Sequence, residues 1–397
     1  MSDAPRRPRT PLRRPAPRTA AAVLLVLVPA CLPFYLSQFW LQTGLFAMAA
    51  VVAAIGLNVL TGAAGQLSMG HAFFLAVGAY GYTWMAGEPG RSGSVHLSGL
   101  GLPPLLAFAL AAVLAGAVGG ALSPISGRLR GMYLGIATLS LVFLGQYAMA
   151  QLTSVTGGYN GRSVTPMEIL GLSFSDESPE GLTVLGVPFG AFERLWYFAL
   201  VVVAAACWTA RNLLRGRPGR ALGALRDSEV AAAVMGVSPT RHRAAAFAVS
   251  STFAGAAGAL LALLFRRVVP EYFGLALSID YLAMIVIGGL GTVAGAVTGA
   301  VLVTLLPQLL AHYADVLPLV GDPSAADTAL GPVEAARYLY GAAVLLVLPL
   351  APGGLAGLLR ERLARPRRTP ATPRTSSTPN TSNTSRTSST SSKESLG

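Results

Sequence analysis

Lysine is almost absent from this chain, whose one lysine is Lys393 in a serine- and threonine-rich tail. A phosphate-binding loop of the Walker type requires the pattern Gly-x-x-x-x-Gly-Lys-[Ser/Thr]. The chain therefore cannot hydrolyse ATP by that machinery. Any ATP-driven activity in which it takes part needs a motor in a separate chain.

Residue patterns of catalytic and metal sites are also missing. The two cysteines, Cys31 and Cys207, lie far apart in apolar runs, which gives neither a disulfide framework nor metal-ligand spacing. The four histidines are dispersed, at His71, His96, His242 and His312. We find no HExxH motif, no Gly-x-Ser-x-Gly elbow and no paired carboxylates within an apolar run. We therefore expect no catalytic residues, no metal site and no cofactor bound by this chain.

Charged residues are scarce, at 12% of the chain, whereas 53% of the residues are hydrophobic and the mean hydropathy is +0.58. This composition is typical of a multispan protein surrounded by membrane lipid. The net charge of +12 would favour nucleic acid as a partner of a soluble chain. Here, however, the arginines lie in the termini and a few loops, and no basic face interleaved with aromatics is present, so we expect no nucleic-acid partner.

Ten apolar runs follow one another along the chain. They cover residues 20–40, 43–60, 71–87, 102–122, 131–153, 194–212, 244–265, 276–294, 296–314 and 335–352. A membrane span needs roughly 17 to 25 residues to cross about 30 Å of hydrocarbon. Residues 276–314 read either as two spans or as one long or re-entrant segment, so eight to ten spans are compatible with the pattern. We predict an all-α polytopic bundle with about ten spans.

Loop charges predict the orientation of these spans in the plasma membrane. Basic residues gather in the N-terminal arm, at Arg128 and Arg130, in residues 213–243 and after residue 359, which places all four on the cytoplasmic side. The loops 154–193 and 315–334 are acidic and fall outside. Arg266 and Arg267 are the exception, on the outer side. Both termini are therefore expected in the cytoplasm.

Three regions divide the chain by composition. Residues 1–19 form a basic, proline-rich arm, predicted to be disordered, and residues 20–359 form the transmembrane domain. Residues 360–397 continue as an arginine-rich and then a serine- and threonine-rich tail, also predicted to be disordered. The sequence Val28-Pro29-Ala30-Cys31 faintly resembles a lipoprotein signal, but apolar sequence continues beyond Cys31, which favours an uncleaved first span.

A basic segment from Arg211 to Arg243 cannot lie in lipid and forms a cytoplasmic knob. Arg217-Pro218-Gly219 predicts a turn, and the run from Arg220 to Gly236 predicts a short helix closed by a glycine, with Ser238-Pro239 as its stop. Such a loop serves either as an orientation anchor or as a docking element for a soluble partner.

The sequence GLNVLTGAAGQLSMGHAFFLAVGAY, residues 56–80, places polar side chains between hydrophobic helices. These are Asn58, Thr61, Gln66, Ser68 and His71. Polar groups at membrane depth need partners, and broken backbone is tolerated there only inside protein or beside water. The pattern fits a discontinuous helix pair lining a transport path, or equally a tight cytoplasmic turn; His71 also suits a structural role.

A second glycine-dense interruption lies late in the chain, with Gly288, Gly289 and Gly291 before Gly295. Small residues allow close helix packing, which alone explains most such runs. Two interruptions, one in each half of the chain, nevertheless point towards a central path between the halves.

The energy source of transport is indicated by what the spans lack. Ion-coupled carriers usually place an acidic group inside the membrane. Here Glu88 and Glu193 lie at the ends of apolar runs, and Asp280 lies near one end. An external motor is therefore favoured over a self-powered carrier or channel, and a membrane-embedded enzyme is the third class considered.

Five ordered stretches between about Leu45 and Leu359 carry a family resemblance. They are residues 56–80, 131–161, 220–260, 285–302 and 340–359. Together they resemble the LivM-type permease subunit of ABC importers for branched-chain amino acids. The N-terminal arm and the tail are not part of the resemblance.

The resemblance implies a second, LivH-like permease, two cytoplasmic ATPases that use ATP and Mg, and an extracytoplasmic substrate-binding protein. It also implies a cytoplasmic coupling helix that seats on the ATPase, with Glu229, Ala231, Ala232 and Gly236 as the matching residues and Arg226 beside them. Val230 separates the glutamate from the alanine pair, which departs from the family pattern. Close relatives carry urea, short amides or other amino acids.

Overall fold

The computed structural model describes residues 29–357 except 93–94, 130, 170–171, 175–182, 185–186, 189, 314–330 and 351–352. The N-terminal arm, residues 20–28 of the first predicted span and the C-terminal tail lie outside the described residues, and so do parts of the two predicted outer loops.

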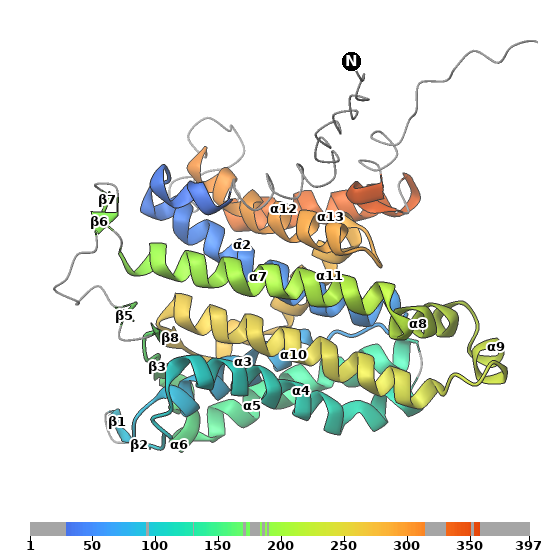
Figure 1. Cartoon of the computed structure of the whole chain (residues 1–397), viewed down its shortest axis with the longest axis horizontal. Coiled ribbons are helices and arrows are strands. Elements are labelled where there is room, and N and C mark those ends of the chain that lie inside the picture. Colours follow the sequence, from blue (N-terminus) through green and yellow to red (C-terminus); the bar gives the residue numbers. More distant parts are fainter. Residues whose placement is uncertain are drawn as a thin grey trace, which may run out of the picture.

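Long helices make up most of the described chain (Figure 1). They are α2 Gln38–Leu57, α3 His71–Ala86, α4 Pro104–Arg128, α5 Met132–Gln151, α7 Ala191–Arg215, α10 Pro239–Phe265, α11 Leu275–Gly288, α12 Val293–His312 and α13 Pro332–Leu350. The shorter helical elements are η1 Leu32–Phe34, η2 Asn58–Ala63, α6 Thr153–Thr156, η3 Gly158–Asn160, α8 Arg217–Asp227, α9 Glu229–Val234 and η4 Pro270–Phe273. The predicted helical bundle is confirmed in this mostly helical form.

Eight short strands form four antiparallel pairs, which the all-α prediction did not include. The pairs are β1 Gly90–Ser92 with β2 Val95–Leu97, β3 Arg162–Ser163 with β8 Arg267–Val268, β4 Glu168–Ile169 with β5 Leu172–Ser173, and β6 Thr183–Val184 with β7 Val187–Pro188. They lie in the connections between helices, where they pair backbone groups that no helix uses.

Six helical segments of the described chain are long and apolar enough to cross a membrane. They are Gln38–Ala63, Pro104–Pro124, Met132–Gln151, Ala191–Arg215, Pro239–Phe265 and Val293–His312, and Leu275–Gly288 is a shorter apolar helix. The chain is therefore a multi-pass membrane protein. Residues 276–314, which the sequence left as one segment or two, form two helices, α11 and α12.

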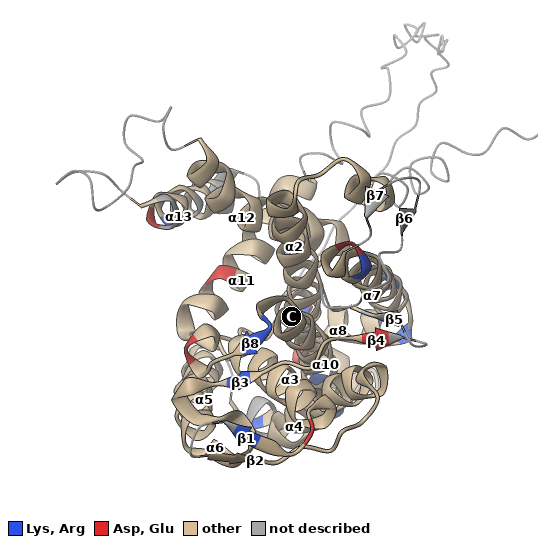
Figure 2. Ribbon diagram, turned by 90° about the vertical axis from the view of Figure 1, so that its left-hand side faces the viewer, with Lys and Arg blue, Asp and Glu red and all other residues tan. Residues whose placement is uncertain are grey.

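The two ends of the bundle differ in structure. Figure 1 shows the long helices running alongside one another, with the strands at the left and α8 and α9 at the right. We call these the strand end and the α9 end. Viewed from the strand end, most of the helix surface is uncharged, and the few acidic positions on helices include one on α11 (Figure 2). That residue is Asp280, the one charged residue of α11.

The core is built around α2 and α10. In their most apolar windows 83% and 72% of the residues are buried, against 17% in α7. Small residues allow the central helices to approach closely: a Cβ added to Gly258 of α10 would lie 1.9 Å from the carbonyl oxygen of Leu75 in α3. The remaining helices pack around this centre and turn their apolar outer faces towards lipid.

Two arginines at the strand end, Arg162 and Arg266, make contacts with other residues of the chain. Arg162 of β3 is buried and donates hydrogen bonds to the carbonyl oxygens of Ser98 and Val155, and its burial lowers the pKa of the guanidinium. Arg266, at the end of α10, lies over the ring of Phe192 at 5.1 Å. These contacts give Arg162 and Arg266 local roles at the side predicted to be external.

Candidate functional site

The basic knob consists of two helices rather than one. The predicted turn at Arg217-Pro218-Gly219 is the first turn of α8, because proline is tolerated where helix N–H groups have no partner anyway. The predicted single helix from Arg220 to Gly236 is interrupted at Ser228, whose extended backbone ends α8. Its hydroxyl oxygen accepts a 3.3 Å hydrogen bond from the Ala231 N–H and so caps α9.

Two of the predicted coupling residues, Glu229 and Ala232, hold α9 against the bundle. Glu229 forms a two-pronged ion pair with Arg243 of α10, at 3.1 and 3.0 Å. Ala232 is 2% exposed and packs inwards, whereas Ala231 is exposed. Gly236 has a φ of +84°, the left-handed conformation in which a glycine commonly follows a helix. The predicted C-terminal glycine is thus correctly located.

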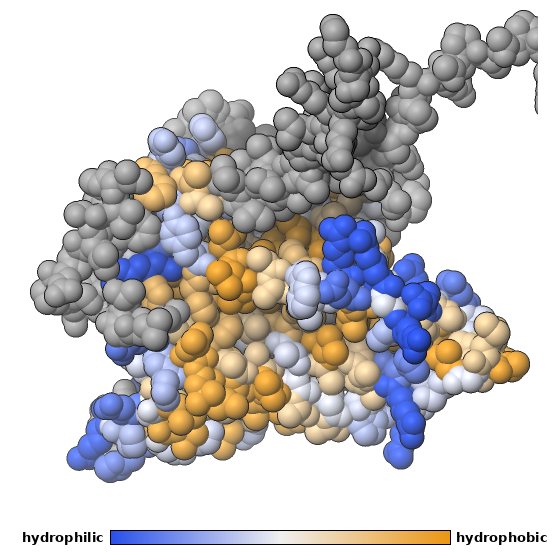
Figure 3. Space-filling model, viewed as in Figure 1, coloured by the Kyte–Doolittle hydropathy of each residue, from blue (hydrophilic) through white to orange (hydrophobic). Residues whose placement is uncertain are grey.

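Three apolar side chains at the tip of α9 are the residues that the sequence reading missed. Val230, Val234 and Met235 are 77%, 85% and 84% exposed. Figure 3 shows the corresponding apolar tip at the far right, beyond a band of hydrophilic residues. Their spacing places them on one side of a short helix, a signal that the sequence contains. Apolar side chains exposed on a polar segment mark an interaction surface.

A hollow of about 650 Å³ adjoins this tip, between α8 and α9. Arg217, Arg220 and Asp227 lie on its α8 side, and Ala231 and Met235 on its α9 side. The α9 end therefore offers an apolar tip beside a concave, partly basic surface.

Both glycine-rich interruptions lie at the α9 end and contact each other. Asn58 donates a 2.8 Å hydrogen bond to the Thr292 carbonyl oxygen and accepts one of 2.8 Å from the Gly291 N–H. Arg226 of α8 donates a hydrogen bond of 2.5 Å to the carbonyl oxygen of Gly62. We call these five residues, Asn58, Gly62, Arg226, Gly291 and Thr292, the glycine junction.

The π-helical turn η2 makes the junction possible. It extends α2 from Asn58 to Ala63 with wider turns, and such turns are often found at functional positions. A Cβ on Gly62 would lie 2.2 Å from the Asn58 Oδ1 and 2.4 Å from the Gly291 nitrogen. The two chain segments can meet because position 62 has no side chain, whereas Gly291 suits its position through its φ of +80°.

Gly288 and Gly289 shape the hairpin between α11 and α12. A Cβ on Gly288 would lie 2.0 Å from the Gly295 carbonyl oxygen, and Gly289 has a φ of +124°, where an added Cβ would lie 2.5 Å from the Gly353 carbonyl oxygen. These glycines therefore allow the sharp reversal and the close packing of the two helices.

Ser68 and His71 are buried and have hydrogen-bond partners. The Ser68 hydroxyl accepts from the Gly70 N–H at 3.4 Å, and the His71 Nε2 lies 2.9 Å from the Ala53 carbonyl oxygen. The His71 ring also packs edge-on against Tyr281. These contacts are those expected for a structural histidine, which is one of the two roles considered for His71.

Unlike Ser68 and His71, the buried polar side-chain atoms of Thr61 and Gln66 lack hydrogen-bond partners among the described residues. The Thr61 hydroxyl oxygen and both amide atoms of Gln66 are buried and have no hydrogen-bond partner in the described part of the chain. Their assignment to a translocation path, like that of Asn58, Ser68, His71 and the three glycines, stays a prediction.

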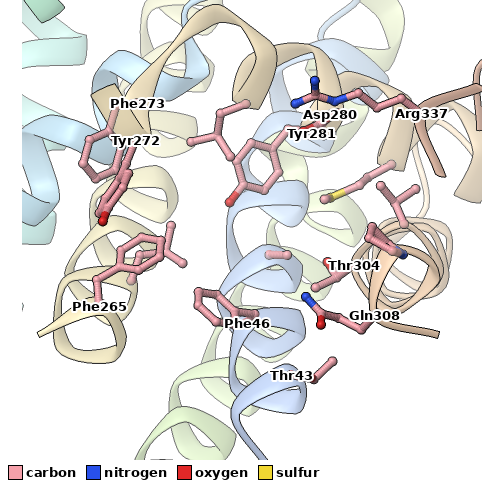
Figure 4. Close-up of a pocket in the computed structure, with 16 residues that line it drawn as sticks. Thr43, Phe46, Phe265, Tyr272, Phe273, Asp280, Tyr281, Thr304, Gln308 and Arg337 are labelled. Carbon is pink, nitrogen blue, oxygen red and sulfur yellow. The ribbon is translucent and has the colours of Figure 1, made fainter. Parts of the chain in front are cut away.

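A cavity of about 320 Å³ lies elsewhere, between α2, α10, η4, α11, α12 and α13. Figure 4 shows its aromatic side chains together with Asp280, Gln308 and Arg337. None of the predicted path residues lines it.

Known proteins agree with the resemblance carried by the five stretches. The chain matches the family described as "Branched-chain amino acid transport system / permease component" over residues 40–348. It is 34% identical over 298 residues to the high-affinity branched-chain amino acid transport system permease protein LivM of Salmonella typhimurium, which covers 73% of this chain and 68% of that protein. The LivM of Escherichia coli is 33% identical over 300 residues, with the same coverage. No solved structure matches the chain. With a family match that extends over most of its length, this chain belongs to the permease components of branched-chain amino acid transport systems.

Proposed function

We propose that this chain is a transmembrane permease subunit of an ATP-driven importer that carries branched-chain amino acids across the cytoplasmic membrane. The names of the two LivM relatives support this substrate class. The lack of a Walker lysine agrees with energy supplied by separate ATPase subunits, which bind ATP and Mg. A second, LivH-like permease and an extracytoplasmic substrate-binding protein complete the proposed assembly.

The observation that carries the proposal is the exposed apolar tip of α9. Burial of an aliphatic side chain of this size contributes about 1.5 to 3 kcal/mol. Val234 and Met235 are more than four-fifths exposed in the chain alone, so a partner that covers them gains that contribution. We infer that α9 is the coupling helix and that its tip seats on an ATPase.

The topology proposed for this assembly has about ten spans and cytoplasmic termini. The arginines of α8 and of the first turn of α10 gather at the α9 end, which suits the cytoplasmic side. The strand end then faces outwards, towards the substrate-binding protein. Of the apolar residues 20–40, which supply the first span in this count, residues 20–28 lie outside the described residues.

Two contacts of the knob would transmit a movement of α9 to the membrane helices. Glu229 ties α9 to α10, and Arg226 ties α8 to the end of α2. When ATP binding draws the two ATPases together, a displaced α9 would thus pull on α10 and on the glycine junction. This provides a mechanical link to alternating access.

A charged substitution at the tip tests the proposal. Val234→Glu should lower both the amount of ATPase that co-purifies with the permease and leucine uptake by at least tenfold, because burial of an unpaired carboxylate is costly. Gly223→Glu is the matched control: Gly223 lies on α8, and a Cβ there meets no atom within 4 Å.

The control should retain ATPase and uptake. Full ATPase recovery with an inserted Val234→Glu permease would reject α9 as the docking helix. Parallel uptake assays with labelled urea and a short amide distinguish the proposed substrate from those of other family members.

A further inference from the structure

The cavity of about 320 Å³ lies in the half of the bundle closer to the strand end. Thr43 is near the first residue of α2, Gln308 is near the last residues of α12, and η4 connects α10 to α11. Its volume falls in the range of small-ligand sites, about 300 to 1,000 Å³. In an importer, this half is the one that a substrate from outside reaches first.

Most of the cavity wall is apolar and aromatic. Phe46 of α2, Phe265 of α10, Phe273 of η4 and Met284 of α11 contribute to it. Figure 4 shows Phe46 and Tyr281 facing the space from the α2 and α11 sides, opposite Phe265 and Tyr272. Such a wall suits an aliphatic side chain, which loses its contact with water there.

Charged groups are confined to one edge of this wall. Asp280 of α11 and Arg337 of α13 both line that edge, and Figure 4 draws them on the same side of the space. Both residues also line a second, largely apolar hollow of about 490 Å³ between α11 and α13. Ionisable residues inside membrane helices are costly and commonly mark substrate pathways.

A further polar group lies on the α12 side. The Thr304 hydroxyl oxygen is buried and has no hydrogen-bond partner among the residues that the structure describes. Gln308 is one turn further along α12 and lines the same space. A buried polar atom without a partner is unfavourable unless a ligand or water completes its hydrogen bonds.

We propose that this cavity binds a zwitterionic α-amino acid with an aliphatic side chain. The Arg337 guanidinium receives the ligand carboxylate, and the Asp280 carboxylate receives the ammonium group. The aliphatic side chain lies among Phe46, Phe265 and Met284, and Thr304 and Gln308 supply further hydrogen bonds. The inference rests on the proposed function and names the substrate site within it, distinct from the predicted path at residues 56–71.

The test uses the assembled importer in lipid nanodiscs, with its ATPases, second permease and binding protein, and a diazirine analogue of leucine as the probe. After illumination, labelled peptides should come from α2, α11 and α12, and excess leucine should reduce their labelling at least tenfold. Leucinamide and 4-methylpentanoate each lack one of the two charges, so each should compete at least tenfold less well than leucine.

Variants separate binding from folding. Asp280→Asn and Arg337→Gln should each reduce labelling and uptake at least tenfold, while the permease still co-purifies with its ATPases. Ala50→Leu adds volume at a lining position of α2 and should reduce labelling by leucine more than by a smaller alanine probe. Glu334→Gln, at an exposed position of α13, is the control and should behave as the unmodified chain does.

Two results would overturn the site. One is labelling confined to other helices, and the other is equal competition by leucine and by the two singly charged analogues, which would leave Asp280 and Arg337 with a structural role only. Failure of the proposed function has a different signature, because no ATPase would then co-purify with the unmodified permease.

Discussion

The glycine junction and the strand-end cavity both bring polar groups into an apolar bundle, but they treat those groups differently. At the junction, Asn58 uses both ends of its amide to hold backbone groups of Gly291 and Thr292. Around the cavity, the buried Thr304 hydroxyl has no partner in the described chain, and Asp280 and Arg337 line the same wall. Satisfied polar groups fix the position of the backbone, whereas a buried polar atom without a partner beside a cavity is available to a ligand.

The largest effect is expected from filling the junction. Gly62→Ala places a methyl group 2.2 Å from the Asn58 Oδ1, so one of the two interruptions must move away from the other. We expect a loss of about 1 to 3 kcal/mol in the free energy of unfolding, as for an overpacked core. Thermal unfolding of the purified permease in detergent measures this loss.

Gly223→Ala provides the comparison for that variant, since the added methyl group meets nothing within 4 Å. Alanine also favours a helix over glycine by about 0.5 to 1 kcal/mol. The control should therefore be as stable as the unmodified chain or slightly more stable. Equal unfolding midpoints for the two variants would contradict the close packing of the junction.

Two buried amides in the same stretch give the next prediction. Asn58→Ala leaves the Gly291 N–H and the Thr292 carbonyl without their bonds, which costs about 1 kcal/mol per bond. Gln66→Ala removes an amide that has no partner in the described chain, so the cost should be much smaller. Chemical unfolding of both variants would contradict this account if Gln66→Ala were as harmful as Asn58→Ala.

Much of this fold could be predicted from the sequence, because long apolar runs leave few alternatives to membrane helices. The polar stretch 56–71 was also correctly singled out as unusual. Its main contact could not be predicted, since Asn58 and Gly291 are 233 positions apart and meet only through helix packing. The single helix predicted for 220–236 was wrong, because the capping hydroxyl of Ser228 offers the backbone an alternative that periodicity does not reveal.

The candidate sites were less accessible to sequence reasoning than the fold. The family pattern selected Glu229 and Ala232, which brace α9, and treated Val230 as an insertion, although Val230 is 77% exposed. Asp280 was read as a residue near the end of an apolar run. Only the packing of α11 against α13 brings it to Arg337 and to the cavity.

A smaller effect on stability, but a clear one on coupling, is expected at Arg226. Arg226→Gln removes the charge-assisted bond to the Gly62 carbonyl, whereas Arg211→Gln, the control, changes an exposed arginine of α7. With Arg226→Gln we expect ATP hydrolysis to continue and the leucine transported per ATP to fall several-fold. An unchanged ratio in proteoliposomes would mean that α8 does not transmit motion to the junction.

The smallest effect on stability should come from Thr304→Val at the cavity. The substitution nearly preserves side-chain shape and removes a hydroxyl that has no partner in the described chain, so unfolding should change by no more than about 0.5 kcal/mol. A hydroxyl bonded within the protein would instead cost about 1 kcal/mol. If Thr304 contacts the substrate, leucine uptake at limiting concentration should fall while the stability holds. The corresponding change at the junction, Asn58→Ala, should reduce stability and uptake together. Measuring stability and uptake for both variants therefore distinguishes a polar group that holds the backbone from one that faces a ligand.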